Sequence, residues 1–309
     1  MALDPSVRKL LQMLENLRVS NFNSMDVGQL RRMMDASPLP HEQIFVKKVE
    51  DISIALGDRK LPARLYIPDE TCRSLIIYFH GGGFVFGNLD THDAICRLAS
   101  SESGCKVLSI DYRLAPENKF PAAAEDAYSS FLWAEENSFS LGIMEDSIAL
   151  AGDSAGGNLA AVACLMLKDK GQKLPRLQVL FYPPIGADLY SESMREYGNG
   201  YLISREQLKW FGDMYLRDDR DALNPYFSPI MHPDLSGLPE AIVVTAEHDP
   251  LRDQAETYVS LLRSAGVQAT GIRSLGMIHG FLSTASLIGP ARDTALMVWK
   301  LVGMKIGRH

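Results

Sequence analysis

Two features of membrane and exported proteins are absent from the 309-residue sequence. The longest apolar run, Leu159 to Leu167, is much shorter than the roughly 18 residues that a membrane-spanning helix needs, so we expect no transmembrane segment. The N-terminal residues include Asp4, Arg8 and Glu15, and therefore lack the apolar core of a secretory signal. We accordingly expect a cytoplasmic protein.

Basic blocks and cysteine motifs are also missing. The net charge is -7, and no block of Lys and Arg is longer than pairs such as Arg31–Arg32, so nucleic acid is not an expected partner. The four cysteines show no CxxC spacing and are too few to crosslink a chain of this size. We predict that they are reduced, mostly buried thiols.

The apolar pattern predicts an α/β fold. A hydrophobic content of 46% can fill a sizeable core. The segments FVKKVEDISIA and LPARLYIP indicate an antiparallel opening hairpin that turns at Gly57-Asp58. Short apolar runs then alternate with longer amphipathic segments, which predicts a mostly parallel sheet of about eight strands with helices on both faces. These runs are SLIIYF, KVLSIDY, SIALAG, RLQVLFYP and EAIVVTA.

Helices are expected in and around this alternation. Leu10, Leu14 and Leu17 recur at helical spacing and predict an N-terminal amphipathic helix with one buried stripe. About fifty aromatic-rich residues after LFYPPIGADL are too many for a simple connection, so we interpret them as an inserted cap. Within it, Ser204 and Gln207 form a capping-box pattern at the start of a helix. The helices predicted elsewhere cover about 91–103, 121–137, 155–170 and 252–265.

The motif GDSAG contains a candidate nucleophile, Ser154. Five letters of the type G-x-S-x-G also occur by chance, but here the strand SIALA precedes them and the apolar run NLAAVACLMLK follows. Strand, sharp turn and helix are the context of a nucleophile elbow, in which glycines leave room for a strained backbone at the serine. Such a turn would expose the Ser154 hydroxyl at the end of the sheet where ligands bind.

The segment YFHGGGFVFG is a candidate oxyanion loop. Consecutive glycines let bare backbone N–H groups converge, so those of Gly82 and Gly83 can join that of Ala155, at the start of the following helix, around a developing negative charge. The alternative is a phosphate-binding loop. That loop would need G-K-[ST] or G-x-G-x-x-G with a suitable helix, and neither is present.

The general base must come from one of seven histidines. The order nucleophile, acid, histidine restricts the candidates to the histidines that follow Ser154 late in the chain. His279 lies in the glycine-flanked loop GMIHGF after the last predicted strand. His232 and His309 are expected to be solvated, which leaves His248 as the one serious rival.

The acid is expected after a strand and before the histidine loop, where EAIVVTAEHDPLRD offers three carboxylates. Asp249 precedes Pro250 in a loop beyond the strand end and would fix the tautomer of His279. Asp253 is expected in the first turn of the next helix, where an acid suits the helix dipole. Glu247 stays a possible substitute, and a structural ion pair is the alternative for all three.

The segment DYRLAPE also carries charged residues, among them Asp111, Arg113 and Glu117. They could be taken for an acid-base cluster. Because they precede the serine, they do not fit the order of a triad. We therefore predict a structural network.

With these residues in view, the chain resembles the hormone-sensitive-lipase-like carboxylesterases, a branch of the α/β-hydrolase fold. The segments that carry the resemblance are HGGGFVFGNLDTHD, DYRLAPENKFPAA, GDSAGGNLAA, AEHDPLRD and HGF, in that order. Departures are few: Gln254 and Ala255 stand where Glu and Gly are common, and Phe84 stands where Trp is frequent. Phe84 adjoins the oxyanion loop, so this change could alter the shape of the pocket.

The resemblance implies a serine carboxylesterase with no cofactor and no metal, acting on short- to medium-chain acyl esters. The site residues it implies are the triad Ser154, His279 and Asp249 and the oxyanion donors Gly82, Gly83 and Ala155. It also implies one α/β-hydrolase domain, in which residues 1–45 and 187–232 form a cap over a body of residues 46–186 and 233–309. We expect an apolar substrate pocket lined by Phe84, Tyr182, Phe211 and Phe281.

Two other functions and one assembly remain open at this stage. The same machinery can cleave amides, lactones or acetylated sugars, and the fold can also serve a non-catalytic receptor for a small ligand. All three triad candidates are present, which disfavours the receptor. The segment VQATGIRSL could be an edge strand whose unpaired backbone allows a homodimer.

Overall fold

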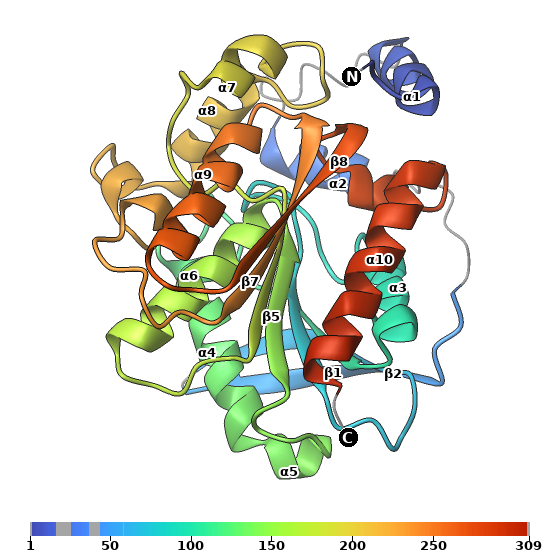
Figure 1. Ribbon diagram of the computed structural model, residues 1–309, viewed down its shortest axis with the longest axis vertical. Helices are drawn as coiled ribbons and strands as arrows, with labels where there is room; N and C mark the ends of the chain where they lie inside the picture. Colours follow the sequence, from blue (N-terminus) through green and yellow to red (C-terminus); the bar gives the residue numbers. More distant parts are fainter. Residues whose placement is uncertain (1, 17–25, 37–43, 58, 308–309) are drawn as a thin grey trace.

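A computed structural model describes residues 2–16, 26–36, 44–57 and 59–307 of the chain. Its centre is one eight-stranded sheet with the order β1-β2-β4-β3-β5-β6-β7-β8 (Figure 1). The strands are β1 (Lys48–Leu56), β2 (Arg59–Ile67), β3 (Leu75–Phe79), β4 (Lys106–Ile110), β5 (Ile148–Asp153), β6 (Leu177–Phe181), β7 (Glu240–His248) and β8 (Ala269–Ile278). The prediction of a mostly parallel sheet of about eight strands is confirmed.

The pairing of the strands divides the sheet into two parts. β1 and β2 form the expected antiparallel hairpin, although Asp58 of its turn lies outside the described residues, and β2 continues antiparallel to β4. From β4 to β8 every neighbouring pair is parallel. Because parallel strands end at the same edge, the loops that follow β3, β5, β7 and β8 are brought to one side of the molecule.

Helices cover both faces of the sheet. α3 (Asp93–Ser103) and α10 (Gly289–Ile306) pack on one face, and α4 (Ala122–Glu136), α6 (Ala155–Asp169) and α9 (Arg252–Ser264) on the other (Figure 1). The four helices predicted in this region are present with ends shifted by two residues or fewer at each terminus. α6 is buried from Ala155 to Leu167 because it lies between the sheet and its neighbours, which explains its all-round apolar sequence.

The long segment between β6 and β7 contains α7 (Glu192–Tyr197), α8 (Arg205–Tyr215) and two short 3-10 turns, Asp221–Leu223 and Pro229–Met231. α8 begins with the predicted capping box: the Ser204 side chain accepts from the Gln207 N–H, and the Gln207 side chain accepts from the Ser204 N–H. The aromatic residues of α8 pack into the body of the protein, since Phe211 and Tyr215 are both buried.

Two helices precede the sheet, α1 (Pro5–Asn16) and α2 (Val27–Asp35). α1 lies at the periphery (Figure 1), where Val7 and Leu10 pack against the core and Leu14 is half-buried. Leu17 of the predicted stripe falls outside the described residues. Two further short elements are α5 (Ser138–Leu141) and a 3-10 turn, Phe281–Thr284. No helix in the described part of the chain is long and apolar enough to cross a membrane.

Candidate active site

The turn between β5 and α6 holds Ser154 in a conformation that is rare for a residue with a side chain, with φ of 51° and ψ of -120°. Its N–H donates to the Phe181 carbonyl oxygen at 2.8 Å, which ties the turn to β6. A Cβ on Gly156 would collide with the Phe79 carbonyl, and one on Gly152 would collide with Gly156. The two motif glycines therefore have the steric role that the sequence predicts.

Ser154 Oγ lies 2.9 Å from His279 Nε2, and His279 Nδ1 lies 2.8 Å from Asp249 Oδ2. Asp249 follows β7, is fully buried, and accepts the Leu251 N–H at its other oxygen at 2.8 Å. A carboxylate can only accept, so the proton of His279 is on Nδ1, and Nε2 is left to accept from the serine hydroxyl. The structure thus brings together three residues that are separated by 95 and 30 positions in the chain.

The loop after β3 carries the two glycines predicted as oxyanion donors. Gly82 and Gly83 have φ of 120° and 60°, which side chains rarely permit. The Gly82 carbonyl accepts from the N–H groups of Val85 and Phe86, at 3.0 and 3.1 Å. Ala155 is the first residue of α6, so its N–H is at the positive end of that helix.

The competing histidines and acids have other partners. The His248 ring stacks on Tyr201, with centroids 5.7 Å apart, and takes no part in the contacts of Ser154. The expectation that His232 is solvated is wrong: its side chain is 9% exposed and binds Asp169 at 3.2 Å. The reason is that the segment before β7 folds back onto the end of α6. His309 lies outside the described residues.

The two other carboxylates of this region bind backbone. Glu247 accepts the Gly276 N–H at 2.7 Å. Asp253 lies in the first turn of α9, as expected, and accepts the Ser193 N–H at 2.7 Å. Asp249 is therefore the carboxylate that meets His279.

The four aromatic residues expected around the substrate are all buried. Phe84 stacks on Tyr215 with centroids 4.0 Å apart, so its ring is part of the packing beneath α8. Tyr182 lies beside His279, with centroids 4.8 Å apart, and beside Phe281 at 5.2 Å.

Phe211 of α8 covers the glycine loop after β3, because a Cβ on Gly83 would collide with its ring. Phe211 of the inserted segment thus contacts the glycine loop, whereas Tyr182, at the end of β6, contacts His279.

The DYRLAPE segment forms the predicted structural network. Arg113 binds the fully buried carboxylate of Asp126 through its side chain and its backbone N–H, and Arg59 binds the same carboxylate at 2.9 Å. The Tyr112 hydroxyl donates to the His80 carbonyl at 2.8 Å, next to the glycine loop after β3. The contacts from Arg113 and Arg59 compensate the burial of the negative charge on Asp126.

The cysteines and possible metal ligands play no part in this arrangement. All four cysteines are buried free thiols, as predicted. Within residues 2–16, 26–36, 44–57 and 59–307, no group of three or more His, Cys, Asp or Glu side chains is placed to hold a metal ion.

Two residues next to the serine and the glycine loop, Asp153 and His92, have no role predicted from the sequence. Both are buried and contact the Gly81 N–H. The position of Asp153 inside the GDSAG motif could have indicated its role. No pattern in the residues around His92 indicates one.

A serine on a strand–turn–helix elbow, hydrogen-bonded to a histidine that binds an aspartate, both on loops after later strands, is typical of the class of α/β hydrolases. The alpha/beta hydrolase fold family matches residues 76–283, and the chain belongs to this family. The chain is 42% identical to the "Arylesterase" of Saccharolobus solfataricus, over 98% of both chains. It is also 42% identical to the "Carboxylic ester hydrolase LipN" of Mycobacterium tuberculosis, over 93% of this chain and 79% of that protein.

A solved hyperthermophilic esterase from Pyrobaculum calidifontis superimposes with a TM-score of 0.89 at 40% identity, over 98% of this chain and 99% of that one. With relatives of this kind over nearly its whole length, the protein is a carboxylic ester hydrolase.

Proposed function

We propose that the protein is a serine carboxylesterase of the hormone-sensitive-lipase-like group that hydrolyses short- to medium-chain acyl esters through Ser154, His279 and Asp249. One observation carries this proposal: the continuous hydrogen-bonded line from Ser154 Oγ to His279 and on to Asp249, at 2.9 and 2.8 Å. Ser154, His279 and Asp249 lie on three separate loops, and packing alone would not require their side chains to align.

In the first half of the reaction, His279 Nε2 takes the hydroxyl proton while Ser154 Oγ attacks the carbonyl carbon of the ester. The carbonyl oxygen gains a negative charge, which the N–H groups of Gly82, Gly83 and Ala155 stabilise. Asp249 stabilises the imidazolium and keeps its orientation. The tetrahedral state then collapses, His279 gives its proton to the alcohol, and the acyl group stays on Ser154.

In the second half, water takes the place of the alcohol. His279 removes a proton from this water, whose oxygen attacks the acyl carbon, and the same N–H groups hold the second oxyanion. Collapse returns the proton to Ser154 and releases the carboxylic acid. Removal of a single oxyanion donor costs on the order of 3 kcal/mol in other hydrolases, so this loop is expected to supply much of the rate.

We propose further that residues 1–45 and 187–232 act as a cap over the body of the enzyme. In support of this, Phe211 of α8 rests on Gly83, and Arg31 of α2 donates to the Val85 carbonyl of the same loop at 2.8 Å. Such a cover leaves limited room beside Ser154, which favours small acyl groups over long lipid chains. Tyr182 and Phe211 would line that space, with Phe84 and Phe281 packed behind them.

The test compares the wild type with Ser154→Ala on p-nitrophenyl esters from acetate to laurate, an amide, a lactone and an acetylated sugar. We expect the wild type to prefer the shorter esters and to be labelled by a fluorophosphonate, and the variant to lose both properties. Turnover in Ser154→Ala would contradict the assignment. A clear preference for the amide, lactone or sugar would replace the substrate class, and tight ligand binding without any hydrolysis would favour a receptor.

A homodimer through β8 is a second part of the proposal. β8 is one edge of the sheet, and exposed residues alternate with half-buried or buried ones over Gly271–Leu275, so its outer backbone before Gly276, whose carbonyl accepts the Asp4 N–H, can pair with another copy. Light scattering between about 1 and 100 micromolar protein tests this at the concentrations where such contacts form. A monomer throughout that range would remove the proposal.

A further inference from the structure

The carboxylate of Asp153 joins the serine turn to the glycine loop. Asp153 ends β5, directly before Ser154, and is 4% exposed. Its Oδ1 accepts the Gly81 N–H at 3.0 Å and the Tyr78 hydroxyl at 2.7 Å. Gly81 immediately precedes Gly82, so this carboxylate holds the last peptide N–H before the proposed oxyanion donors.

The close approach depends on the absence of a side chain at residue 81. A Cβ on Gly81 would collide with Asp153 Oδ2. Gly82 and Gly83 follow with positive φ. Glycine has few conformational restrictions, so the direction of these N–H groups depends on the contacts that hold the loop and not on their own backbone preferences.

His92 supplies a second acceptor for the same N–H. Its Nε2 lies 3.2 Å from the Gly81 nitrogen, and its Nδ1 lies 2.9 Å from Thr91 Oγ1. The single hydroxyl proton of Thr91 is donated to the Asn88 carbonyl at 3.0 Å, so Thr91 accepts from Nδ1–H of the ring. Nε2 then carries no proton and accepts from Gly81, which shares its N–H between His92 and Asp153.

The charge of Asp153 is maintained in spite of its burial. Burial acts to raise the pKa of Asp153, whereas the hydrogen bonds that its Oδ1 accepts from the Tyr78 hydroxyl and the Gly81 N–H favour the charged form. A charged acceptor forms stronger hydrogen bonds than a neutral one. The Gly81 N–H is therefore held firmly.

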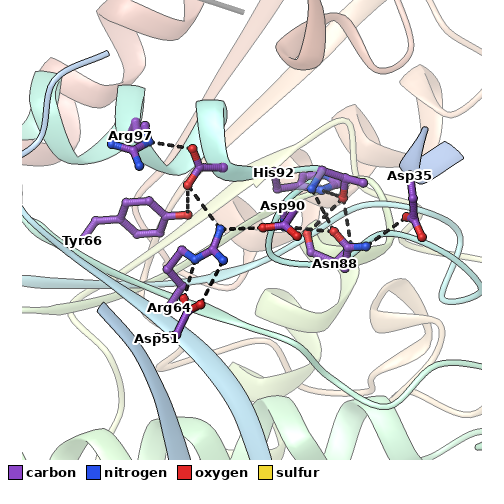
Figure 2. Close-up of polar contacts among 10 residues, drawn as sticks. Asp35, Asp51, Arg64, Tyr66, Asn88, Asp90, His92 and Arg97 are labelled. Atoms are coloured by element: carbon purple, nitrogen blue, oxygen red, sulfur yellow. Dashed lines mark hydrogen bonds and ion pairs between the residues drawn. The ribbon is translucent and has the colours of Figure 1, made fainter. Parts of the chain in front are cut away.

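The turn that presents His92 is itself anchored to other parts of the fold (Figure 2). Asn88 donates to Asp35 of α2 at 2.9 Å and accepts from the Thr91 N–H at 2.9 Å. Asp90, in the same turn, accepts from Arg64 of β2 at 2.8 Å. His92 thus has a fixed place relative to both α2 and the sheet.

We propose that Asp153 and His92 are positioning residues for the oxyanion loop: by sharing the Gly81 N–H they fix the peptide from which Gly82 and Gly83 are aimed at the developing oxyanion. The inference rests on the proposed function of that loop. It adds a requirement that the triad does not contain, namely a buried pair of acceptors for the Gly81 N–H.

The experiment measures ester turnover together with inhibition by an alkyl trifluoromethyl ketone. In this adduct Ser154 Oγ bonds to the ketone carbon, the hydroxyl proton passes to His279, and the negative charge stays on the ketone oxygen, where the proposed N–H donors, including those of the loop, stabilise it. For Asp153→Ala we expect kcat to fall roughly tenfold to a hundredfold, with KM little changed and the inhibition constant raised by a similar factor.

Three further variants separate positioning from general loss of structure. Asp153→Asn keeps an oxygen acceptor of the same size and should restore kcat to within about fivefold of the wild type. His92→Leu, which also serves if Asp153→Ala does not fold, should show a smaller loss of the same kind. Ser74→Ala removes a buried hydrogen bond to Ile306, 2.8 Å long, just before β3, and should lower thermal stability without changing the inhibition constant.

The outcomes distinguish this inference from the proposed function. Turnover in Ser154→Ala would overturn the proposed function itself. If Ser154→Ala is inactive, wild-type kcat in both Asp153→Ala and His92→Leu would overturn the positioning role alone. Loss of turnover with an unchanged inhibition constant, or an equal loss in Asp153→Asn, would overturn it as well.

Discussion

The ring of Phe211 occupies the space that a side chain on Gly83 would need. Phe211 belongs to α8 of the inserted segment, and Gly83 belongs to the loop after β3, so 128 residues of chain separate two groups in direct contact. Since the contact places an aromatic side chain over a proposed oxyanion donor, it links the inserted segment to the chemistry at Ser154.

Gly83→Ala should inactivate the enzyme. The added methyl group meets Phe211, and φ of 60° becomes strained, so the N–H at residue 83 is displaced from the oxyanion. We expect kcat/KM to fall by roughly a hundredfold or more. The matched control is Gly104→Ala, which has φ of 68° but no heavy atom near its added Cβ.

In this control, urea unfolding should show a loss of about 1–2 kcal/mol with kcat/KM unchanged. Wild-type kcat/KM in Gly83→Ala would contradict the role of residue 83.

Phe211→Ala should change the preference for acyl length. Removal of the ring opens space beside the loop, so the ratio of kcat/KM for p-nitrophenyl laurate to that for acetate should rise. Because Phe211 is buried, its loss should also lower the free energy of unfolding by about 3–5 kcal/mol. Phe139→Ala, at a position that is 98% exposed, is the control and should leave both quantities unchanged. An unaltered acyl profile in Phe211→Ala would place the acyl pocket elsewhere.

Arg31→Ala should weaken the attachment of α2. The guanidinium donates to the carbonyls of Val85 and Ala115, both at 2.8 Å, and to both carboxylate oxygens of Glu117. It also holds the pKa of Glu117 below its usual value through the hydrogen bond between them. Loss of these donors should reduce the free energy of unfolding by about 1.5–3 kcal/mol and lower kcat.

Arg31→Lys should recover only part of this loss, because an ammonium group cannot make the forked contact. Arg220→Ala removes an arginine whose side chain is 91% exposed and should have no effect. The same stability in both alanine variants would mean that the Arg31 contacts contribute nothing.

His80 should make the fold sensitive to acid. Burial, the largest cause, lowers the pKa of His80 to about 3, so the folded protein keeps this ring neutral. The unfolded chain binds a proton near pH 6.5, and stability is therefore lost as the pH falls from about 6.5 toward 3, by about 1.4 kcal/mol per pH unit for one group.

Urea unfolding at pH 7 and pH 5 measures this slope. His80→Asn keeps a donor for the Gly81 carbonyl, which accepts from His80 Nδ1 at 2.8 Å, and should show a smaller slope. Equal slopes in the two proteins would mean that other groups govern acid sensitivity.

Much of the local structure could be predicted because it depends on neighbouring residues. The turn at Ser154 needs a strand, then small residues, then an apolar helix, and all three follow one another in a single stretch of the sequence. The capping box of α8 needs only Ser204 and Gln207. The apolar alternation likewise predicts which segments form a buried parallel sheet.

The wrong expectation for His232 and the missing role of His92 have a common cause. Each side chain is buried by residues far away in sequence: His232 meets Asp169, and His92 meets Gly81 and Asp153. No pattern among neighbouring residues in the sequence predicts a contact of this kind. The aromatic residues show the same limit, since Phe84 is buried against Tyr215 of the inserted segment.

By itself, the sequence determined the fold class and the chemistry available, because strand and helix periods, turn glycines and the order of serine, acid and histidine are properties of short segments. Only the tertiary structure decided that Asp249, and not Glu247 or Asp253, meets His279, and that Asp153 holds Gly81. The physical reason is that a hydrogen bond forms only when its donor and acceptor atoms lie about 3 Å apart. Which groups come within that range depends on the register of β3, β5, β7 and β8, which is set by packing over the whole sheet.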